Sequence, residues 1–323
     1  MSVRPQEDPT PASAFPGVHT SRRSLPVALM QALRPRQATK NLFVYAALVF
    51  SGKLFDPVLF GRATLAFLLF AGASGSIYLL NDILDAEQDR QHPEKRHRPI
   101  ASGDLPVSVA WTSALLLAAG SLAAGFLLHP KFGLVLLAYI LLQLSYNFYL
   151  KHQVLLDVFA IAGGFVLRTV AGGAVDDIYI SRWLLLCSLL LALLLGFGKR
   201  RQELVLLGTE ADQHRRILRA YSLPFLDQIL NIVSGVTIVC YSVYCVESAS
   251  AIRHPHLWVT IPIVIYSVCR YLYLVHQKGM GGAPDEVLLQ DRALQVAILL
   301  WFCLILLLFA FDSPAIQFWG ERP

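Results

Sequence analysis

Three aspartates with helical spacing are the residues of this sequence best suited to metal or phosphate chemistry. Asp82, Asp85 and Asp89 are three and four positions apart, so a helix would place all three side chains on one face. Carboxylates on one face repel each other and need a compensating cation. Their oxygens suit Mg²⁺, which often binds through one or two carboxylates together with substrate phosphates. Asn81 can add an amide contact, and the lack of interleaved His or Cys argues against zinc.

A basic run follows these carboxylates and contains Lys95, Arg96 and Arg98. The whole charged stretch, residues 81–103, lies between two apolar runs, residues 59–80 and 107–128. Charges between membrane-length apolar runs are costly unless they meet water or a ligand. We interpret the stretch as the mouth of an active site at a membrane surface. The alternative is a solvated acidic loop with a helix cap.

A second cluster of charges ends another apolar run and is basic. Lys199, Arg200 and Arg201 follow Gly198, and Glu203 is the one carboxylate close to them in sequence. Clustered cations at a membrane surface suit the binding of an anion such as a phosphate. The alternative is that these cations only anchor a helix end on the cytoplasmic side.

The composition is that of a polytopic, all-α membrane protein. The 323 residues are 55% hydrophobic and 15% charged, with a mean hydropathy of +0.54, whereas soluble domains carry roughly 25% charged residues. A spanning helix needs about 20 mostly apolar residues. Nine candidate spans follow: residues 39–55, 59–82, 106–128, 132–150, 154–175, 182–198, 228–247, 257–275 and 293–311.

The chain divides into a short tail and one membrane domain. Residues 1–24 are rich in Pro and Ser without periodicity, which predicts a disordered tail and not a signal peptide. Residues 25–323 are expected to form the single domain. The five cysteines all lie in apolar segments without metal-ligand spacing, which is typical of buried free thiols.

The distribution of basic residues predicts the orientation in an inner (plasma) membrane. Most of the 27 Lys and Arg fall in the N-terminal segment and in the loops that follow even-numbered spans. Cytoplasmic loops carry such an excess. The N-terminus and both charged clusters should therefore face the cytoplasm, and nine spans would leave the C-terminus outside.

The first acidic motif, Asn81-Asp82-x-x-Asp85-x-x-x-Asp89, with its continuation Lys95-Arg96-His97-Arg98-Pro99-Ile100-Ala101-Ser102-Gly103, resembles the UbiA superfamily of intramembrane prenyltransferases. That resemblance implies nine transmembrane helices around a central cavity and a Mg²⁺-diphosphate site on the cytoplasmic side. Members of the superfamily ordinarily carry a second aspartate-rich motif on the loop after the sixth span. Here Lys199 to Arg201 stand in its place.

This departure resembles one branch of the superfamily, the polyprenyl (decaprenyl)-phosphate phosphoribosyltransferases. The branch-like motifs are Arg34-Pro35-Arg36-Gln37-x-x-Lys40-Asn41, Gly198-Lys199-Arg200-Arg201-x-Glu203-Leu204 and Tyr221-Ser222-x-x-Phe225-Leu226-Asp227-Gln228. The resemblance implies a pentosyltransferase that moves 5-phosphoribose from phosphoribosyl pyrophosphate to a polyprenyl phosphate. The product would be a lipid-linked phosphoribose for cell-wall arabinan synthesis.

Residue roles follow from that interpretation. Asp82, Asp85 and Asp89 would be the catalytic residues, holding Mg²⁺ and the leaving pyrophosphate. The lipid phosphate is already ionised at neutral pH, so no general base is required, and His92 and His97 are interpreted as surface residues. The expected substrate-binding residues are Lys40, Tyr78, Asn81, Lys95, Arg96, Arg98, Tyr146, Lys151, Asp157, Lys199, Arg200, Arg201 and Glu203, with Lys95, Arg96 and Arg98 forming a lid.

Two further charges are assigned mainly structural roles. Arg168 lies inside an apolar span and is expected to bond a backbone carbonyl, Asp176 or Asp177. Asp291 follows a glycine-rich turn, and a place in the site is not favoured for it.

Two other functions stay open. An ordinary prenyltransferase would pass an isoprenyl group from its diphosphate to an aromatic or other acceptor. A membrane transporter would need charges along a path across the membrane, and the charges gather on one side instead. The apolar faces permit a homo-oligomer without requiring one, and nothing suggests a nucleic-acid partner.

Overall fold

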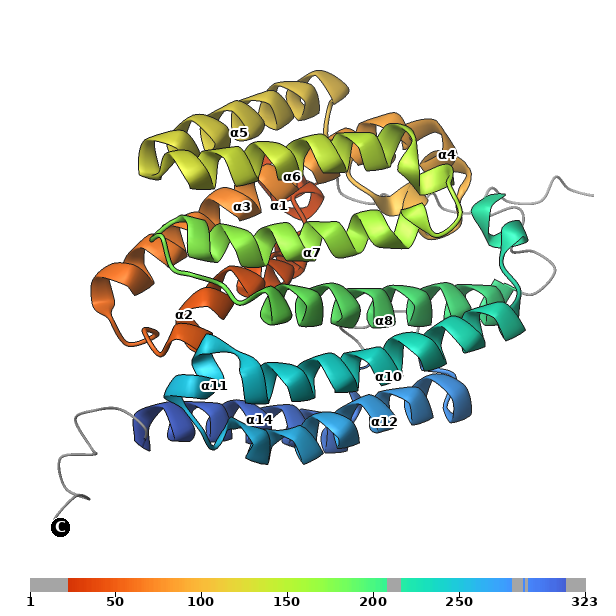
Figure 1. Cartoon of the computed structure of the whole chain (residues 1–323). Helices are drawn as coiled ribbons and strands as arrows, with labels where there is room; N and C mark the ends of the chain where they lie inside the picture. Colours follow the sequence, from red (N-terminus) through yellow and green to blue (C-terminus); the bar gives the residue numbers. More distant parts are fainter. Residues whose placement is uncertain (1–22, 208–215, 281–286, 288–289, 312–323) are drawn as a thin grey trace, which may run out of the picture.

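The computed structural model describes residues 23–207, 216–280, 287 and 290–311, and these residues form helices and connecting turns without a strand (Figure 1). The N-terminal helices are α1 (Leu25–Ala32), η1 (Pro35–Tyr45), α2 (Ala46–Ser51), α3 (Pro57–Leu84), α4 (Ala86–Gln91) and η2 (Lys95–His97). The central ones are α5 (Val107–Leu128), α6 (Pro130–Phe148), η3 (Leu150–His152), α7 (Leu156–Ala174) and α8 (Arg182–Leu207). The remaining ones are η5 (Arg216–Ala220), α10 (Leu223–Glu247), α11 (Ala249–Arg253), η6 (Leu257–Thr260), α12 (Ile261–Gln277) and α14 (Arg292–Phe311).

Eight segments in the described part of the chain are long and apolar enough to cross a membrane. They are α3, α5, α6, α7, α8, α10, η6 with α12, and α14, which confirms the all-α membrane fold and eight of the predicted spans. Their outward side chains are apolar; Leu116 on α5 and Leu299 on α14, for example, are 68% and 62% exposed. Such faces suit lipid, because hydrocarbon makes no demand for polar groups.

The first predicted span, residues 39–55, is not a single α-helix. The chain there forms the 3₁₀ helix η1, then α2, and turns at Gly52, whose φ of 74° is the left-handed region that favours glycine. A 3₁₀ helix rises about 2 Å per residue. With α2 the segment extends roughly 30 Å, about the thickness of the hydrocarbon core. The structure therefore does not confirm the count of nine, which stays a prediction.

η1 lies against α3 and α7. A close backbone approach makes this possible: a Cβ built on Gly172 of α7 would lie 1.9 Å from the carbonyl oxygen of Val44. Any side chain at Gly172 would therefore push η1 away. The contact places the polar side of η1, including Asn41, inside the bundle.

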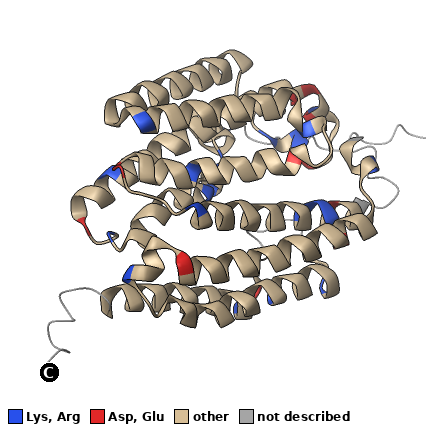
Figure 2. Ribbon diagram, in the orientation of Figure 1, with Lys and Arg blue, Asp and Glu red and all other residues tan. Residues whose placement is uncertain are grey.

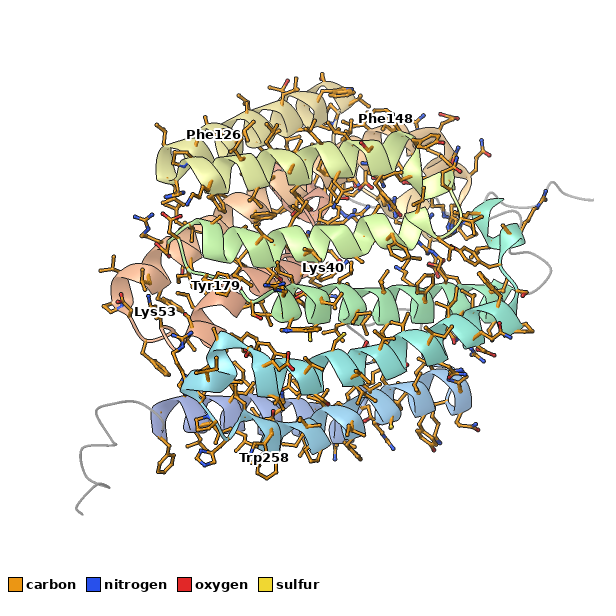
Figure 3. All side chains as sticks on the ribbon, in the orientation of Figure 1. Lys40, Lys53, Phe126, Phe148, Tyr179 and Trp258 are labelled. Atoms are coloured by element: carbon orange, nitrogen blue, oxygen red, sulfur yellow. The ribbon has the colours of Figure 1, made fainter. Side chains whose placement is uncertain are left out.

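Consecutive long helices pack side by side, from α5 and α6 through α7, α8 and α10 to α12 and α14 (Figure 1). α3, α6, α8 and α12 all end at one side of the bundle, the right side of Figure 1. The turn of Lys53, between α2 and α3, lies at the opposite end, whereas Lys40 lies within the outline of the bundle (Figure 3). Charged residues gather around the end of α3 (Figure 2). These helix ends lead into the loops that the sequence analysis placed together on one side of the membrane. That this side is the cytoplasmic one stays a prediction.

The predicted tail, residues 1–24, lies outside the described residues except for Arg23 and Ser24. Arg23 donates a hydrogen bond to the carbonyl oxygen of His97 at 3.1 Å. α1 packs its buried Ala28 and Ala32 in one cluster with Leu79 of α3 and with Ile100 and Leu105. α1 is thereby fixed beside the charged end of α3.

Candidate active site

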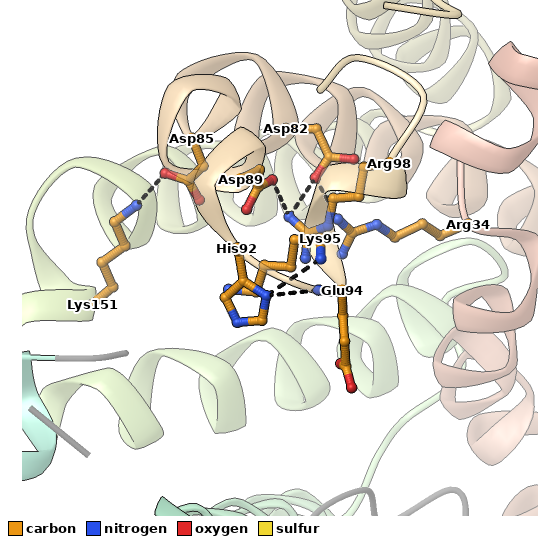
Figure 4. A network of polar contacts seen from close by, with 9 residues as sticks. All are labelled: Arg34, Asp82, Asp85, Asp89, His92, Glu94, Lys95, Arg98 and Lys151. Atoms are coloured by element: carbon orange, nitrogen blue, oxygen red, sulfur yellow. Dashed lines mark hydrogen bonds and ion pairs between the residues drawn. The ribbon is translucent and has the colours of Figure 1, made fainter. Parts of the chain in front are cut away.

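The acidic motif spans a helix break. α3 ends at Leu84, Asp85 caps it with a φ of −93° and ψ of 2°, and α4 begins at Ala86. Asp82 and Asp89 are buried and close together, whereas Asp85 is turned aside toward Lys151, 3.4 Å away (Figure 4). The expectation that all three aspartates share one face of one helix is therefore wrong, because the break at Asp85 changes the direction of the chain.

Two arginines from different segments meet the buried pair of aspartates. Arg98 Nη1 lies 3.1 Å from Asp82 Oδ1 and 2.6 Å from Asp89 Oδ2 (Figure 4). Arg34 bonds the same oxygen of Asp82, and its guanidinium lies over the ring of Tyr78, 5.3 Å from the centroid. One positive group thus sits between two converging carboxylate oxygens.

This geometry fits a divalent cation held by two carboxylates. The position of Arg98 Nη1 shows that Asp82 and Asp89 can share one cation between them. In the described part of the chain no three His, Cys, Asp or Glu side chains come close enough to hold a metal ion. Two carboxylates are sufficient for Mg²⁺ when substrate phosphates complete its coordination. Asp82 and Asp89 are thus the natural pair, with Asp85 outside it in this conformation.

Arg34 belongs to the site although the sequence interpretation left it out of the expected site residues. It follows α1, and its φ of 54° and ψ of 62° are unusual for a residue other than glycine that precedes a proline. Such strain persists where the surroundings require it, commonly at functional sites. The signal available in the sequence was the Arg34-Pro35-Arg36 motif, but its contact with Asp82 joins segments 48 residues apart.

A groove adjoins Arg34 on the outside of the bundle. It has a volume of about 680 Å³ and is lined by residues of α1 and the start of η1, among them Val27, Met30, Arg34 and Arg36. Val27 and Met30 are 48% and 57% exposed. The groove therefore presents an apolar wall and two cations to the same space.

In the basic motif at the end of α8, the arginines form ion pairs with carboxylates of the protein. Arg200 is 2% exposed, and it donates from Nε to Asp157 Oδ2 at 2.7 Å and from Nη1 to Glu203 Oε2 at 2.6 Å. The Tyr221 hydroxyl donates to Asp157 Oδ1 at 2.8 Å and accepts from the backbone N–H of Leu155 at 2.7 Å. Burial raises the pKa of Tyr221, so this hydroxyl keeps its proton and remains a donor.

Arg201 is held in a similar way. Its Nε lies 2.5 Å from Asp227 Oδ1 and its Nη1 donates to the carbonyl oxygen of Val275 at 3.2 Å. His276 also approaches Asp227, at 3.2 Å. Lys199 is exposed on the surface of α8. Of the three predicted phosphate-binding cations, two thus face carboxylates of the protein itself, and one of these carboxylates is Asp157, which the sequence predicted to bind substrate.

The other predicted site residues lie at the same end or deeper in the bundle. Lys95 and Arg96 are exposed in η2, and the His92 ring accepts hydrogen bonds from the backbone N–H groups of Glu94 and Lys95. The half-buried residues are Lys40, Tyr78, Asn81, Tyr146 and Lys151. The structure brings Asp82, Asp89, Arg98 and Tyr78 together around Arg34 and leaves Lys95 and Arg96 at the rim.

Arg168 and Asp291 both contact groups of the protein itself. Arg168 contacts the Gly164 carbonyl oxygen, as expected, but neither Asp176 nor Asp177, which pair with Arg62 and Lys131. The Arg270 guanidinium bonds Asp291 through two nitrogens and lowers the pKa of that carboxyl.

The fold and the site define a class: a polytopic helical membrane protein with a cation-accepting carboxylate pair at one end of the bundle. The UbiA prenyltransferase family model matches residues 41–282, so the chain belongs to the UbiA prenyltransferase family.

Several curated relatives match nearly the whole chain. A decaprenyl-phosphate phosphoribosyltransferase of Mycobacterium tuberculosis is 32% identical over 87% of this chain and 94% of its own length. Proteins of the same name from Mycolicibacterium smegmatis and Corynebacterium glutamicum are 36% and 34% identical, over 86% and 88% of this chain and 91% and 87% of their own lengths.

Solved structures show the same fold at lower identity. A UbiA homolog from Archaeoglobus fulgidus bound to GPP and Mg²⁺ superposes with a TM-score of 0.67 at 18% identity, covering 88% of this chain and 99% of that chain. The same homolog bound to Cd²⁺ gives a TM-score of 0.63. These neighbours hold divalent metals, and their likeness to this chain concerns the fold.

Proposed function

We propose that this protein transfers 5-phosphoribose from phosphoribosyl pyrophosphate to a polyprenyl phosphate, such as decaprenyl phosphate, and releases pyrophosphate. One observation carries the proposal: the buried carboxylates of Asp82 and Asp89 converge on a single cation position, which Arg98 Nη1 occupies. Two more cations lie beside it, Arg34 on Asp82 and Lys151 on the neighbouring Asp85. A carboxylate pair for a metal, surrounded by cations for phosphates, suits a pyrophosphate. The relatives named as phosphoribosyltransferases support the choice of sugar donor.

Bound Mg²⁺ would neutralise negative charge on the leaving pyrophosphate. Asp82 and Asp89 would hold the ion, and Asn81, one position before Asp82, would add a contact. Arg34, Arg98 and Lys151 are 29%, 26% and 20% exposed in their side chains, so they can turn from the aspartates to phosphate oxygens. These cations then keep the pyrophosphate in place while the bond to the ribose C1 breaks.

The lipid phosphate attacks C1 as an anion, and no protein base is needed for the step. Tyr78, one turn before Asp82 on α3, lies beside Arg34 and can orient the ribose. The acceptor needs a surface that combines cations with apolar walls. The groove of Val27, Met30, Arg34 and Arg36 has this combination, and it leads toward Asp82 through Arg34.

This assignment shifts the emphasis away from the basic motif of α8. Arg200 and Arg201 already bond Asp157, Glu203 and Asp227, so they hold the end of α8 in place. Lys199 lies exposed beside them. The site faces the cytoplasm, in agreement with the Lys and Arg distribution, and the C-terminus lies outside.

A prenyltransferase with an aromatic or other acceptor is the second candidate, because the family is named for that reaction and a structural neighbour holds GPP. Purified protein in lipid nanodiscs should be incubated with Mg²⁺, labelled phosphoribosyl pyrophosphate and decaprenyl phosphate, and in parallel with an isoprenyl diphosphate and an aromatic acceptor. We expect a labelled lipid phosphate diester in the first reaction only. Consumption of the isoprenyl diphosphate, with no labelled lipid from the sugar donor, would select the second candidate.

A further inference from the structure

A buried arginine occupies the interior of the bundle beneath the acidic motif. Arg168 on α7 is 3% exposed. It donates from Nε to Asn41 Oδ1 at 2.7 Å, from Nη1 to the Gly164 carbonyl oxygen at 3.0 Å and from Nη2 to the Tyr139 hydroxyl at 2.8 Å. Its guanidinium also lies over the ring of Tyr139, 4.7 Å from the centroid. Neutral groups from η1, α6 and α7 thus hold the guanidinium of Arg168 in place.

No carboxylate faces this arginine within the residues that the structure describes. All of its hydrogen-bond partners are neutral, so its positive charge is not compensated there. A charge in a membrane interior is costly unless it is paired. In addition, Asn41 is 1% exposed and its Nδ2 donor has no hydrogen-bond partner. The buried guanidinium of Arg168 and the neighbouring Asn41 Nδ2 donor together suit the binding of an anion.

The Arg168 site is connected to the acidic motif along one face of α3. Ser74, Tyr78 and Asp82 are each four residues apart, so their side chains follow one stripe. Ser74 at the lower end bonds the Tyr139 hydroxyl at 3.0 Å, and Tyr139 in turn bonds Arg168. Eight helical residues rise about 12 Å. The site therefore lies roughly two helical turns below Asp82, with Tyr78 between them.

We infer that Arg168 and Asn41 bind a phosphate monoester, the 5-phosphate of the sugar donor, while Asp82 and Asp89 hold the metal-bound pyrophosphate at its other end. The inference rests on the proposed function and adds the determinant of donor specificity. A sugar donor with an anion at each end matches a stripe with a metal-binding end and a cationic end. A prenyl tail below Asp82 would instead meet a buried cation, an amide and the Gln143 side chain, which bonds Tyr139 at 2.9 Å.

The test compares two donors that differ in one group: phosphoribosyl pyrophosphate and α-ribosyl pyrophosphate, which lacks the 5-phosphate. Dissociation constants are measured with Mg²⁺ on purified protein in nanodiscs. Hydrogen bonds to charged groups suggest that the wild type prefers the phosphorylated donor about 10- to 100-fold. In Arg168→Met this ratio should fall below about 3-fold, because only the 5-phosphate loses its contact.

A second variant guards against misfolding. Asn41→Asp keeps the size of the side chain and places a carboxylate beside the Arg168 Nε, so it supplies internally the anion that we assign to the ligand. It should fold at least as well as the wild type and lose the preference for the 5-phosphate. Arg62→Met is the matched control: it removes another partly buried arginine, on α3 at the opposite end beside Asp176, and should keep the full preference.

Three outcomes would overturn the inference. The preference could survive in Asn41→Asp. Both donors could weaken equally in Arg168→Met while Arg62→Met stays normal, which would make Arg168 structural. The variants could raise the KM for decaprenyl phosphate alone, which would assign the site to the lipid phosphate. Failure of the proposed function is distinct, since the wild type would then bind neither donor.

Discussion

The ends of α3 and α8 both combine clustered charges, but they hold them differently. At the end of α3 two of the three aspartates, Asp82 and Asp89, are buried. The cations that pair with the three aspartates are Arg34, Arg98 and Lys151, which come from other segments and keep 29%, 26% and 20% of their side chains exposed. At the end of α8 the cations themselves are enclosed: the side chain of Arg200 is 2% exposed and that of Arg201 is 13% exposed. Carboxylates of α7, of α8 itself and of α10 surround them.

The difference in burial separates an exchangeable pairing from a fixed one. A partly exposed cation already reaches water, so it can turn from its carboxylate to a phosphate without first being desolvated or freed from the core. Removing one member of a buried pair leaves an uncompensated charge and costs about 3–5 kcal/mol. The end of α3 is therefore suited to exchange its arginines for a metal and a pyrophosphate. The end of α8 is suited to fix α7, α8 and α10 relative to each other.

The largest expected effect is a loss of activity at the end of α3, where the ion pairs are exchangeable. Asp82→Asn removes half of the carboxylate pair and should lower kcat/KM by about 1000-fold, since metal stabilisation of a transition-state charge is worth several kcal/mol. It should also abolish the Mg²⁺-dependent thermal stabilisation by phosphoribosyl pyrophosphate. The matched control is Asp104→Asn: Asp104 directly follows the charged stretch, accepts a hydrogen bond from Ser102, and has its Oδ2 3.6 Å from Arg23 Nη1. Full stabilisation in Asp82→Asn would remove Asp82 from the site.

The second prediction breaks the fixed pairing. Arg200→Met should destabilise the protein by about 3–5 kcal/mol, because it leaves Asp157 buried beside Tyr221 without its cation. Arg98→Met should destabilise the protein less than Arg200→Met, because Arg98 is partly exposed and Asp82 keeps Arg34, while it weakens donor binding. Thermal midpoints in one detergent, together with dissociation constants for the donor, give both readouts. The double variant Arg200→Met with Asp157→Leu should regain most of the lost stability.

An opposite ranking of the two single variants would contradict the comparison. If Arg98→Met destabilised the protein more than Arg200→Met, the arginines at the end of α3 would be structural. If Arg200→Met left the midpoint unchanged and weakened binding, the basic motif would be the phosphate site that the sequence first suggested.

The eight long spans could be predicted from the sequence because each depends on a local property, a run of about 20 apolar residues. The acidic motif was also visible, since its spacing is local. The segment of Lys40 and Asn41 was predicted as an ordinary span, but it is a 3₁₀ helix, because its close packing on Gly172 depends on a helix more than 100 residues away. Apolar content alone does not specify such packing.

The pairing of charges could not be predicted for the same reason. Arg200 is 43 residues from Asp157, and Arg34 is 48 residues from Asp82, so only the folded bundle brings them together. The spacing of Asp82, Asp85 and Asp89 also allows a continuous helix, and the break at Asp85 reflects the course of the chain beyond it. Sequence spacing gave the type of ligand; tertiary contacts decided which two carboxylates converge.

The smallest expected effect concerns Lys151, which tests whether the third exposed cation exchanges as Arg34 and Arg98 do. Its Nζ lies 3.4 Å from Asp85 Oδ1, and both side chains are partly exposed, at 20% and 29%. Lys151→Met should therefore leave the thermal midpoint within error, because such pairs contribute at most about 1 kcal/mol. If Lys151 turns to the pyrophosphate, the donor should bind about 3- to 10-fold more weakly. If the variant still binds the donor more weakly than the wild type at high salt, Lys151 contacts the donor directly. If high salt abolishes the difference between the two proteins, Lys151 acts only through the positive electrostatic potential at this end of the bundle.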